Sequence, residues 1–144
     1  MATKGKGARF HLFNGTALQK IAEVVSLTPP SPTRDTIDTT THDSTGDYRE
    51  FISSLIDAGE ATVLIHYNPG SVDDTLINTA MAAGDLRAFA MDLNKPGTTA
   101  QHRVSGSALV TSYAPADVVI DDKMTASLTL KVSGPLIFAP APVN

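Results

Sequence analysis

Histidine and carboxylate side chains gather in one polar stretch of the sequence. His42 and Asp43 are adjacent, and Asp47 and Glu50 follow closely. Such a group could ligate a hard metal ion, which takes several oxygen ligands at defined spacing. The spacing here matches neither an EF-hand loop nor the zinc motif HExxH. We therefore interpret these residues as solvated loop side chains and predict no metal site.

Two acidic pairs raise the question of acid–base catalysis. Asp73-Asp74 is explained by stabilisation of a helix N-terminus, and Asp121-Asp122 by a turn before the last strand. Serine, histidine and aspartate all occur, but the sequence contains no G-x-S-x-G elbow, no phosphate-binding loop and no GxGxxG motif. The sequence therefore predicts a protein that is not an enzyme and that uses no cofactor.

Length and composition are typical of one soluble domain. The chain has 144 residues and no cysteine, which excludes thiol chemistry and suits a reducing compartment. The basic start MATKGKGARF is not followed by an apolar segment, and no apolar run approaches the roughly 18 residues of a membrane span. We expect a protein made in a cytoplasm, without a signal peptide and without a membrane partner.

The charge content bears on the partner. Net charge is −4 and only 18% of residues are charged. An acidic balance argues against a protein that grips nucleic acid, which is usually basic. A weakly charged surface indicates that much of it is covered by copies of the same chain. Those copies would also close exposed sheet edges.

The elements that must carry these residues are mostly strands. We predict strands over residues 8–14, 61–67, 86–93, 101–115 and 124–134. The segment 61–67 is apolar on both faces, so both faces are expected to be covered. Together these patterns predict a mainly β protein of about seven or eight strands, an antiparallel sandwich or flattened barrel with one flanking helix and a long extended arm.

The helix is the clearest single element. Ser71 is a good N-cap with Asp74 three residues later, and Gly84 is placed to end the helix. One apolar face is expected, formed by Val72, Leu76, Ala80 and Ala83 with Ile77 alongside.

Three segments are less clear. Residues 16–28 have spacing that could suit a helix, but the short Asn14-Gly15 link favours a hairpin strand. Residues 47–59 could form a short strand or a helical turn. Gly106 lies inside a long strand, where a bulge is expected.

The most unusual segment is the polar stretch Thr33–Ile52, which is rich in threonine and aspartate and follows Pro29–Pro32. A loop of that length is uncommon in a compact domain and is usually functional or disordered. We interpret residues 29–59 as an assembly arm that leaves its own subunit. Residues 1–7 are expected to be flexible, and the Pro-rich tail 135–144 is expected to dock on a neighbour.

Three stretches, taken in order, resemble the major tail tube proteins of long non-contractile-tailed, lambda-like phages. The first is DTIDTTTHDSTGDYREFISSLIDAGEATVLIHYNPG, an arm leading into YREFI and a strand ending in Y-x-P. The second is the helix segment SVDDTLINTAMAAGDLRAFAMDL, and the third is MTASLTLKVSGP. They span most of the chain between Thr33 and Pro135.

The resemblance implies six-membered rings that stack into a hollow tube, the conduit for genome delivery. It implies the chain itself as partner, along with tape measure, tail tip and terminator proteins, and passage of double-stranded DNA without binding. It implies a place in the virion tail after assembly in the host cytoplasm. The alternative is a small β-sandwich binding or decoration module, or a tube protein like that of type VI secretion.

Within this interpretation the arm supplies the contacts between subunits. Tyr48 and Phe51 are the expected buried anchors, because aromatic residues dominate interface cores. Arg49 and Glu50 are expected to give cross-subunit pairing. The full set of contact candidates is Arg34, Asp38, His42, Asp43, Tyr48, Arg49, Glu50 and Phe51.

The tube lumen carries its own expectation. Since Lys and Arg that hold phosphates would slow a passing duplex, we expect lumen-facing side chains to be mainly Asp, Glu, Ser and Thr. Any Lys or Arg there should be paired with a carboxylate. The strands that flank the helix are the first candidates for this wall.

Overall fold

A computed structural model describes residues 5–95 and 101–141. Its elements are β1 (Arg9–Phe13), β2 (Leu18–Lys20), β3 (Val24–Thr28), β4 (Thr33–Asp38), β5 (Phe51–Asp57), β6 (Glu60–His66), α1 (Val72–Ala83), β7 (Arg87–Asn94), β8 (Gln101–Pro115), β9 (Thr125–Val132) and β10 (Ile137–Pro140). The predicted mainly β, antiparallel fold with one helix is confirmed.

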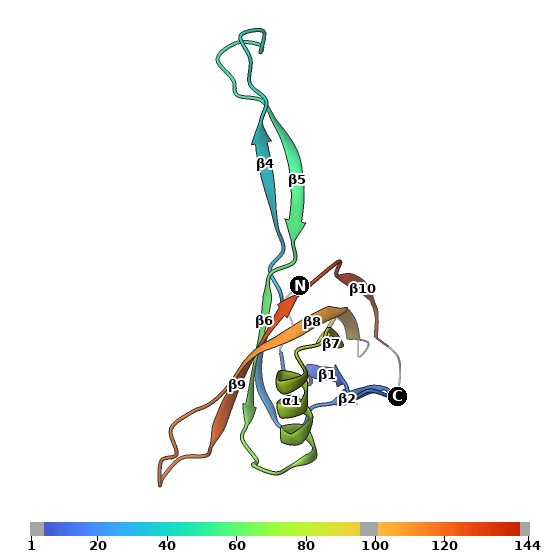
Figure 1. The fold of residues 1–144 in the computed structure, drawn as a ribbon, viewed down its shortest axis with the longest axis vertical. Coiled ribbons are helices and arrows are strands. Elements are labelled where there is room, and N and C mark those ends of the chain that lie inside the picture. The colour runs from blue at the N-terminus through green and yellow to red at the C-terminus, as the bar shows by residue number, and fades with distance from the viewer. Residues whose placement is uncertain (1–4, 96–100, 142–144) are drawn as a thin grey trace.

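Most strands belong to one antiparallel sheet. The order is β2-β1-β7-β8-β9-β6-β3, and β10 adds to β8 beside the point where β9 ends. Strands β4 and β5 form a separate sheet of two strands that projects from the rest (Figure 1). We call Thr33–Asp57 the arm and the remaining described residues the body.

The core of the body follows the alternation expected for strands. In β9 the side chains of Ala126, Leu128, Leu130 and Val132 are buried and their neighbours are half-buried, as predicted. In β6, Val63 and Ile65 are buried in the same core while the other face is only partly covered. A sheet that hides one face so completely needs a second layer, and α1 supplies part of it.

Helix α1 packs on β8 and begins and ends where the sequence predicts (Figure 1). The Ser71 hydroxyl accepts a hydrogen bond from the Asp74 amide at 3.2 Å, and Gly84 takes the left-handed conformation with φ 65°. Leu76, Ile77 and Ala80 are buried as predicted.

The predicted helix face is wrong at both ends. Val72 is 73% exposed, and Ala83 is exposed as well. Asp74 is buried instead, because its carboxylate accepts a hydrogen bond from the Tyr113 hydroxyl of β8 at 2.9 Å. Burial of the phenol, and then this bond, raise the pKa of Tyr113. The polar contact turns the helix so that Val72 faces solvent.

Two of the uncertain segments resolve into strands. Residues 16–28 form β2 and β3 rather than one strand, because Glu23 takes a positive φ of 58° between them. Strand β2 pairs with β1 as the predicted hairpin, whereas β3 pairs with β6. Within residues 47–59, the segment Phe51–Asp57 is strand and no helical turn forms.

The expected bulge at Gly106 is wrong. The ladder between β7 and β8 runs through Gly106 opposite Phe89 without a shift, and the irregularity lies between Val110 and Ser112 on the other edge. A Cβ at Gly106 would lie 3.2 Å from the Pro135 carbonyl oxygen. The glycine therefore allows the C-terminal segment to cross β8 closely.

Both terminal segments are held by the body. β10 pairs with β8 of its own chain, although we expected the tail to dock on a neighbour. The Gln101 side chain donates to the Gly7 carbonyl at 2.8 Å, which ties down the end of a segment expected to be flexible. Residues 1–4 and 142–144 lie outside the described residues.

Candidate assembly surface

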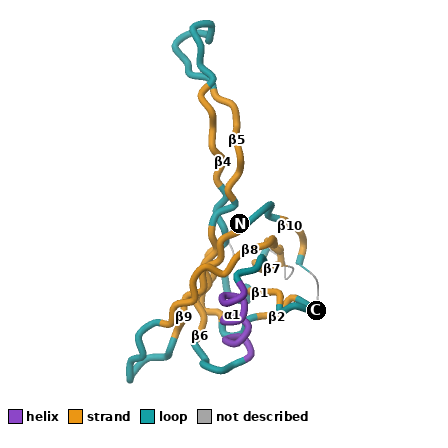
Figure 2. The backbone as a smooth tube through the Cα atoms, viewed as in Figure 1, coloured by secondary structure: helices purple, strands orange, loops and turns teal. Residues whose placement is uncertain are grey.

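The polar stretch Thr33–Ile52 forms most of a long β-hairpin. β4 and β5 pair antiparallel, with Ile37 opposite Ile52 and Asp38 opposite Phe51. Residues 39–50 form the loop at its tip, which lies far from the body (Figure 2). The Thr39 amide closes the loop on the Glu50 carbonyl at 2.8 Å. The expected extended arm is confirmed, as a hairpin with a loop rather than one structureless segment.

Large apolar side chains on the arm are exposed. Leu55 is 84% exposed and Tyr48 is 81% exposed. Each of the others is at least half exposed: Ile37, Phe51, Ile52 and Ile56. An isolated hairpin of two strands is marginally stable in water, and its edges have unpaired N–H and C=O groups. The arm therefore presents large apolar side chains and unpaired strand edges to solvent.

The base of the arm makes close contacts with the body. Gly59 has a φ of 87°, and a Cβ there would lie 2.6 Å from the Ser31 carbonyl oxygen. The segments before β4 and after β5 therefore leave the body in close contact. The Asp57 carboxylate accepts hydrogen bonds from the Gly59 amide at 2.9 Å and from the Lys131 ammonium of β9 at 3.2 Å. In that order, these contacts lower the pKa of Asp57.

An apolar groove lies beside this base. Its volume is about 780 Å³. It is lined by arm and C-terminal residues, among them Leu55, Ile56, Val132, Pro135, Leu136 and Phe138. The groove thus extends the exposed apolar surface of the arm onto the body.

All eight sequence-predicted contact residues lie on the arm. Arg34 and Asp38 are in β4, Phe51 begins β5, and the rest are in the tip loop: His42, Asp43, Tyr48, Arg49 and Glu50. Of these, the structure brings Arg49 to Asp38 at 3.4 Å, a pair within the chain and exposed to solvent. Hydrogen bonds from Thr40, and then from Arg49, lower the pKa of Asp38.

The sequence interpretation missed the aliphatic part of this surface. Ile37, Ile52, Leu55 and Ile56 belong to it as much as the two aromatic residues do. The signal was present in REFISSLID, where isoleucine and leucine fall on both faces of one short strand. That pattern is typical of a strand covered on both sides.

A second hairpin tip lies at the other end of the molecule. The connection between β8 and β9 projects away from the arm (Figure 1). It carries three consecutive apolar side chains, Val118, Val119 and Ile120, and Ile120 is fully exposed. The molecule thus presents uncovered apolar side chains at both ends of its long axis.

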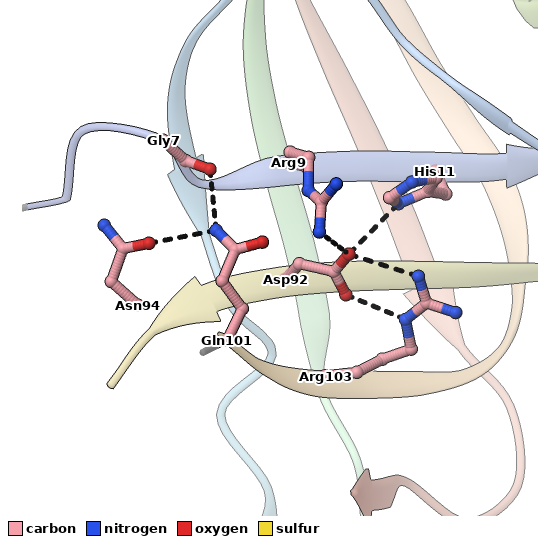
Figure 3. Close-up of polar contacts among 7 residues, drawn as sticks. All are labelled: Gly7, Arg9, His11, Asp92, Asn94, Gln101 and Arg103. Atoms are coloured by element: carbon pink, nitrogen blue, oxygen red, sulfur yellow. Dashed lines mark hydrogen bonds and ion pairs between the residues drawn. The ribbon is translucent and has the colours of Figure 1, made fainter. Parts of the chain in front are cut away.

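A buried charge cluster lies on the sheet face opposite the core (Figure 3). Asp92 is fully buried and accepts two hydrogen bonds from Arg103, at 2.7 and 3.1 Å. Arg9 lies 3.2 Å from the same carboxylate, and His11 lies 3.9 Å from it. Burial raises the pKa of Asp92, but the contacts with Arg103 outweigh burial and the net pKa is lowered. A carboxylate held ionised between two guanidinium groups is a structural element rather than a proton donor.

Neither a metal-ligand group nor a membrane-spanning helix occurs in residues 5–95 and 101–141. None of them forms a group of three or more histidine, cysteine or acidic side chains that could hold a metal ion. Their helix is neither long nor apolar enough to cross a membrane.

The comparison with known families decides the identity. A family model described as lambda phage tail tube protein matches residues 4–139, nearly the whole chain. The chain belongs to the lambda phage tail tube protein family. It is accordingly a structural protein of the virion tail, and the arm and tips are to be explained as parts of a tube subunit. Among curated proteins, no sequence gives a significant match.

Solved structures support the fold. The tail of an empty gene transfer agent particle, refined with helical C6 symmetry, gives a TM-score of 0.76 at 19% identity over 96% of this chain and 99% of that chain. The PVC sheath/tube terminator of an extracellular contractile injection system gives 0.74 at 13% identity over 96% of both chains. The SPP1 tail tube gives 0.66 at 11% identity over 93% of this chain and 77% of that chain.

Proposed function

We propose that this protein polymerises as stacked hexameric rings into a hollow tail tube, the conduit for genome delivery. The observation that carries the proposal is the arm, a hairpin whose apolar side chains are exposed on both faces. A folded subunit gains nothing by keeping such a surface in water, whereas a neighbouring copy that covers it removes apolar area from solvent. The six-fold ring number follows the C6 symmetry of the gene transfer agent tail.

The arm contacts between subunits belong to this proposal. Tyr48 and Phe51 would anchor the arm on a neighbour, together with Leu55 and Ile56 at its base. Arg34 and Glu50 would supply polar contacts at the rim. Because the Arg49 pair with Asp38 is internal and exposed, we assign it to the shape of the tip rather than to affinity.

Other partners follow from the role. At its ends the tube would meet tape measure, tail tip and terminator proteins, and assembly would take place in the host cytoplasm. Double-stranded DNA would pass through the lumen without binding. The acidic balance of the chain, 15 acidic against 11 basic residues, supports the last point, because a neutral or acidic wall does not hold phosphates.

Electron microscopy of the purified protein over a range of concentrations tests the proposal. We expect rings or tubes. A variant in which an Asn-Gly turn replaces residues 39–50 should keep the folded body and lose polymerisation, since the tip loop makes no contact with the core. Monomer at every concentration, also in the presence of tail-initiating proteins, would contradict the proposal.

A further inference from the structure

The net charge of the chain is concentrated in the arm. The whole chain carries −4, and the arm alone has six acidic and two basic side chains, which also gives −4. The rest of the chain is therefore formally neutral. Because the arm has no core of its own, its charge must be balanced by solvent or by another molecule.

Most carboxylates of the arm are unpaired among the described residues. Asp38 pairs with Arg49 and Asp57 pairs with Lys131. The other four make no ion pair there: Asp35, Asp43, Asp47 and Glu50. Three of these four are in the tip loop, the part of the arm farthest from the body (Figure 1).

One corner of the body has the opposite charge. Arg9 near the start of β1 and Arg103 near the start of β8 share the single carboxylate of Asp92 (Figure 3). Burial lowers the pKa of the neighbouring His11, so its imidazole adds no charge near neutral pH. The Asn94 side chain donates to the Lys6 carbonyl, which brings Lys6 close to Lys95 at the same end of the sheet. We call Lys6, Arg9, Lys95 and Arg103 the basic corner.

The guanidinium groups of this corner can take a second carboxylate. Each has five N–H donors. Arg103 uses its Nε and one terminal nitrogen on Asp92, and Arg9 uses one terminal nitrogen. The two side chains keep 20% and 22% of their surface in contact with solvent. Lys6 is exposed and, like Lys95, makes no ion pair among the described residues.

The arm of the same chain cannot supply that carboxylate, because its tip projects away from the body (Figure 2). We infer that the acidic tip of one copy docks on the basic corner of a second copy. The inference rests on the proposed function and adds the pair of surfaces that fixes register between subunits. A contact between two different patches leaves one patch free at each end of the assembly. Further copies can therefore add until a ring closes or a filament forms.

Duplex DNA is the other polyanion that a basic corner could bind. The second copy is favoured because the charges are complementary within one chain: the arm carries −4, and the rest of the chain is neutral with a cationic corner. DNA on the corner would leave the arm carboxylates unbalanced. Complementary charge at an interface chiefly sets register and association rate, and salt weakens it.

Charge exchange tests the inference. The tip variant is Asp43→Lys with Asp47→Lys, and the corner variant is Lys6→Glu with Lys95→Glu. These four side chains make no ion pair among the described residues, and neither change touches the Asp92 cluster. Each variant should lower the pelleted tube mass at low salt about tenfold or more, since like charges then face each other. The two changes combined in one chain should restore assembly.

A matched control separates specific pairing from net charge. Asp117→Lys with Asp121→Lys, on the β8–β9 tip, makes the same charge change as the tip variant. Combined with the corner variant it gives a chain of identical net charge, which should not recover. Equal recovery of both combinations, or tubes from every variant at the wild-type level, would overturn the inference and leave the proposed function intact.

Two further outcomes separate failure of the proposed function from failure of this inference alone. If wild-type protein forms neither rings nor tubes, the proposed function fails and this inference fails with it. If duplex DNA binds the wild type in a salt-sensitive way, and the corner variant loses that binding but still forms tubes, the corner serves DNA and the inference is wrong.

Discussion

The body and the arm use the same antiparallel ladder with opposite results for their side chains. In β9 every second side chain is buried in the core, whereas all six residues of β4 are exposed. In both regions each strand forms a hydrogen-bonded ladder with a neighbouring strand. What the arm lacks is a second layer, so its hydrogen bonds remain open to water and its apolar side chains contribute little to folding. We therefore expect the body to fold alone and the arm to gain stability only when a neighbouring copy covers it.

Removal of one aspartate from each region tests this difference. Asp92→Ala should lower the free energy of unfolding by about 3–5 kcal/mol, because it leaves two partly buried guanidinium groups without their carboxylate. Asp38→Ala should cause no measurable change, since its pair with Arg49 is exposed. Urea unfolding of both variants measures the contrast, and equal losses would show that the arm is part of the folding unit.

A second comparison uses leucines. Leu128 of β9 is fully buried, and Leu128→Ala should cost about 2–5 kcal/mol through lost transfer energy and the cavity left behind. Leu55 of the arm is 84% exposed, so Leu55→Ala should leave the unfolding midpoint unchanged and instead reduce tube formation. If Leu55→Ala destabilised the monomer as much as Leu128→Ala, the arm would not be an uncovered surface.

The junction between the two regions gives a smaller effect. Gly59→Ala and Gly70→Ala both place a side chain at positive φ, 87° and 79°, which costs about 1–2 kcal/mol. At Gly59 the new Cβ would also lie 2.6 Å from the Ser31 carbonyl oxygen, whereas Gly70 has open space around it. The midpoint temperature of thermal unfolding should therefore be lower for Gly59→Ala than for Gly70→Ala. The reverse order would contradict the close contact at the base of the arm.

Local signals in the sequence predicted the elements that are stabilised locally. The cap residues Ser71 and Gly84 set both ends of α1, and strict alternation set the buried face of β9. The predicted burial of Val72 failed because a contact distant in sequence, Tyr113 with Asp74, sets the rotation of the helix. Periodicity contains no information about such a partner.

The candidate surface was predicted in part for the same reason. Composition and length predicted an arm over Thr33–Ile52. They did not predict that Thr33–Asp38 pairs with Phe51–Asp57 into a hairpin, since residues 39–50 carry no tight-turn signal. The Asp92 cluster was not predicted at all. Arg9 and Arg103 meet this carboxylate only through the registers of β1 and β8 against β7. Register between strands far apart in sequence is a property of the folded sheet.

The smallest expected effect concerns pH and belongs to the body alone. Burial lowers the pKa of His11 below 6.5, although the nearby Asp92 carboxylate opposes the shift. As pH falls through 6.5, the unfolded chain binds a proton that the folded chain does not, so the free energy of unfolding decreases. Asp92 affects stability only at lower pH. Its pKa in the folded state lies below 3.8, so the stability that it contributes is lost only as pH falls below 3.8.

The slope between pH 7 and 5 should therefore belong largely to His11. We expect wild-type stability to fall by less than about 1.4 kcal/mol for each unit of pH, the limit for one proton. His11→Gln cannot bind that proton and should give a flatter profile, measured by urea unfolding at a series of pH values. His42→Gln is the matched control on the exposed tip loop, and it should leave the slope unchanged. Wild-type stability that rises on acidification from pH 7 to 5 would show that the imidazole gains more from the carboxylate than burial costs it.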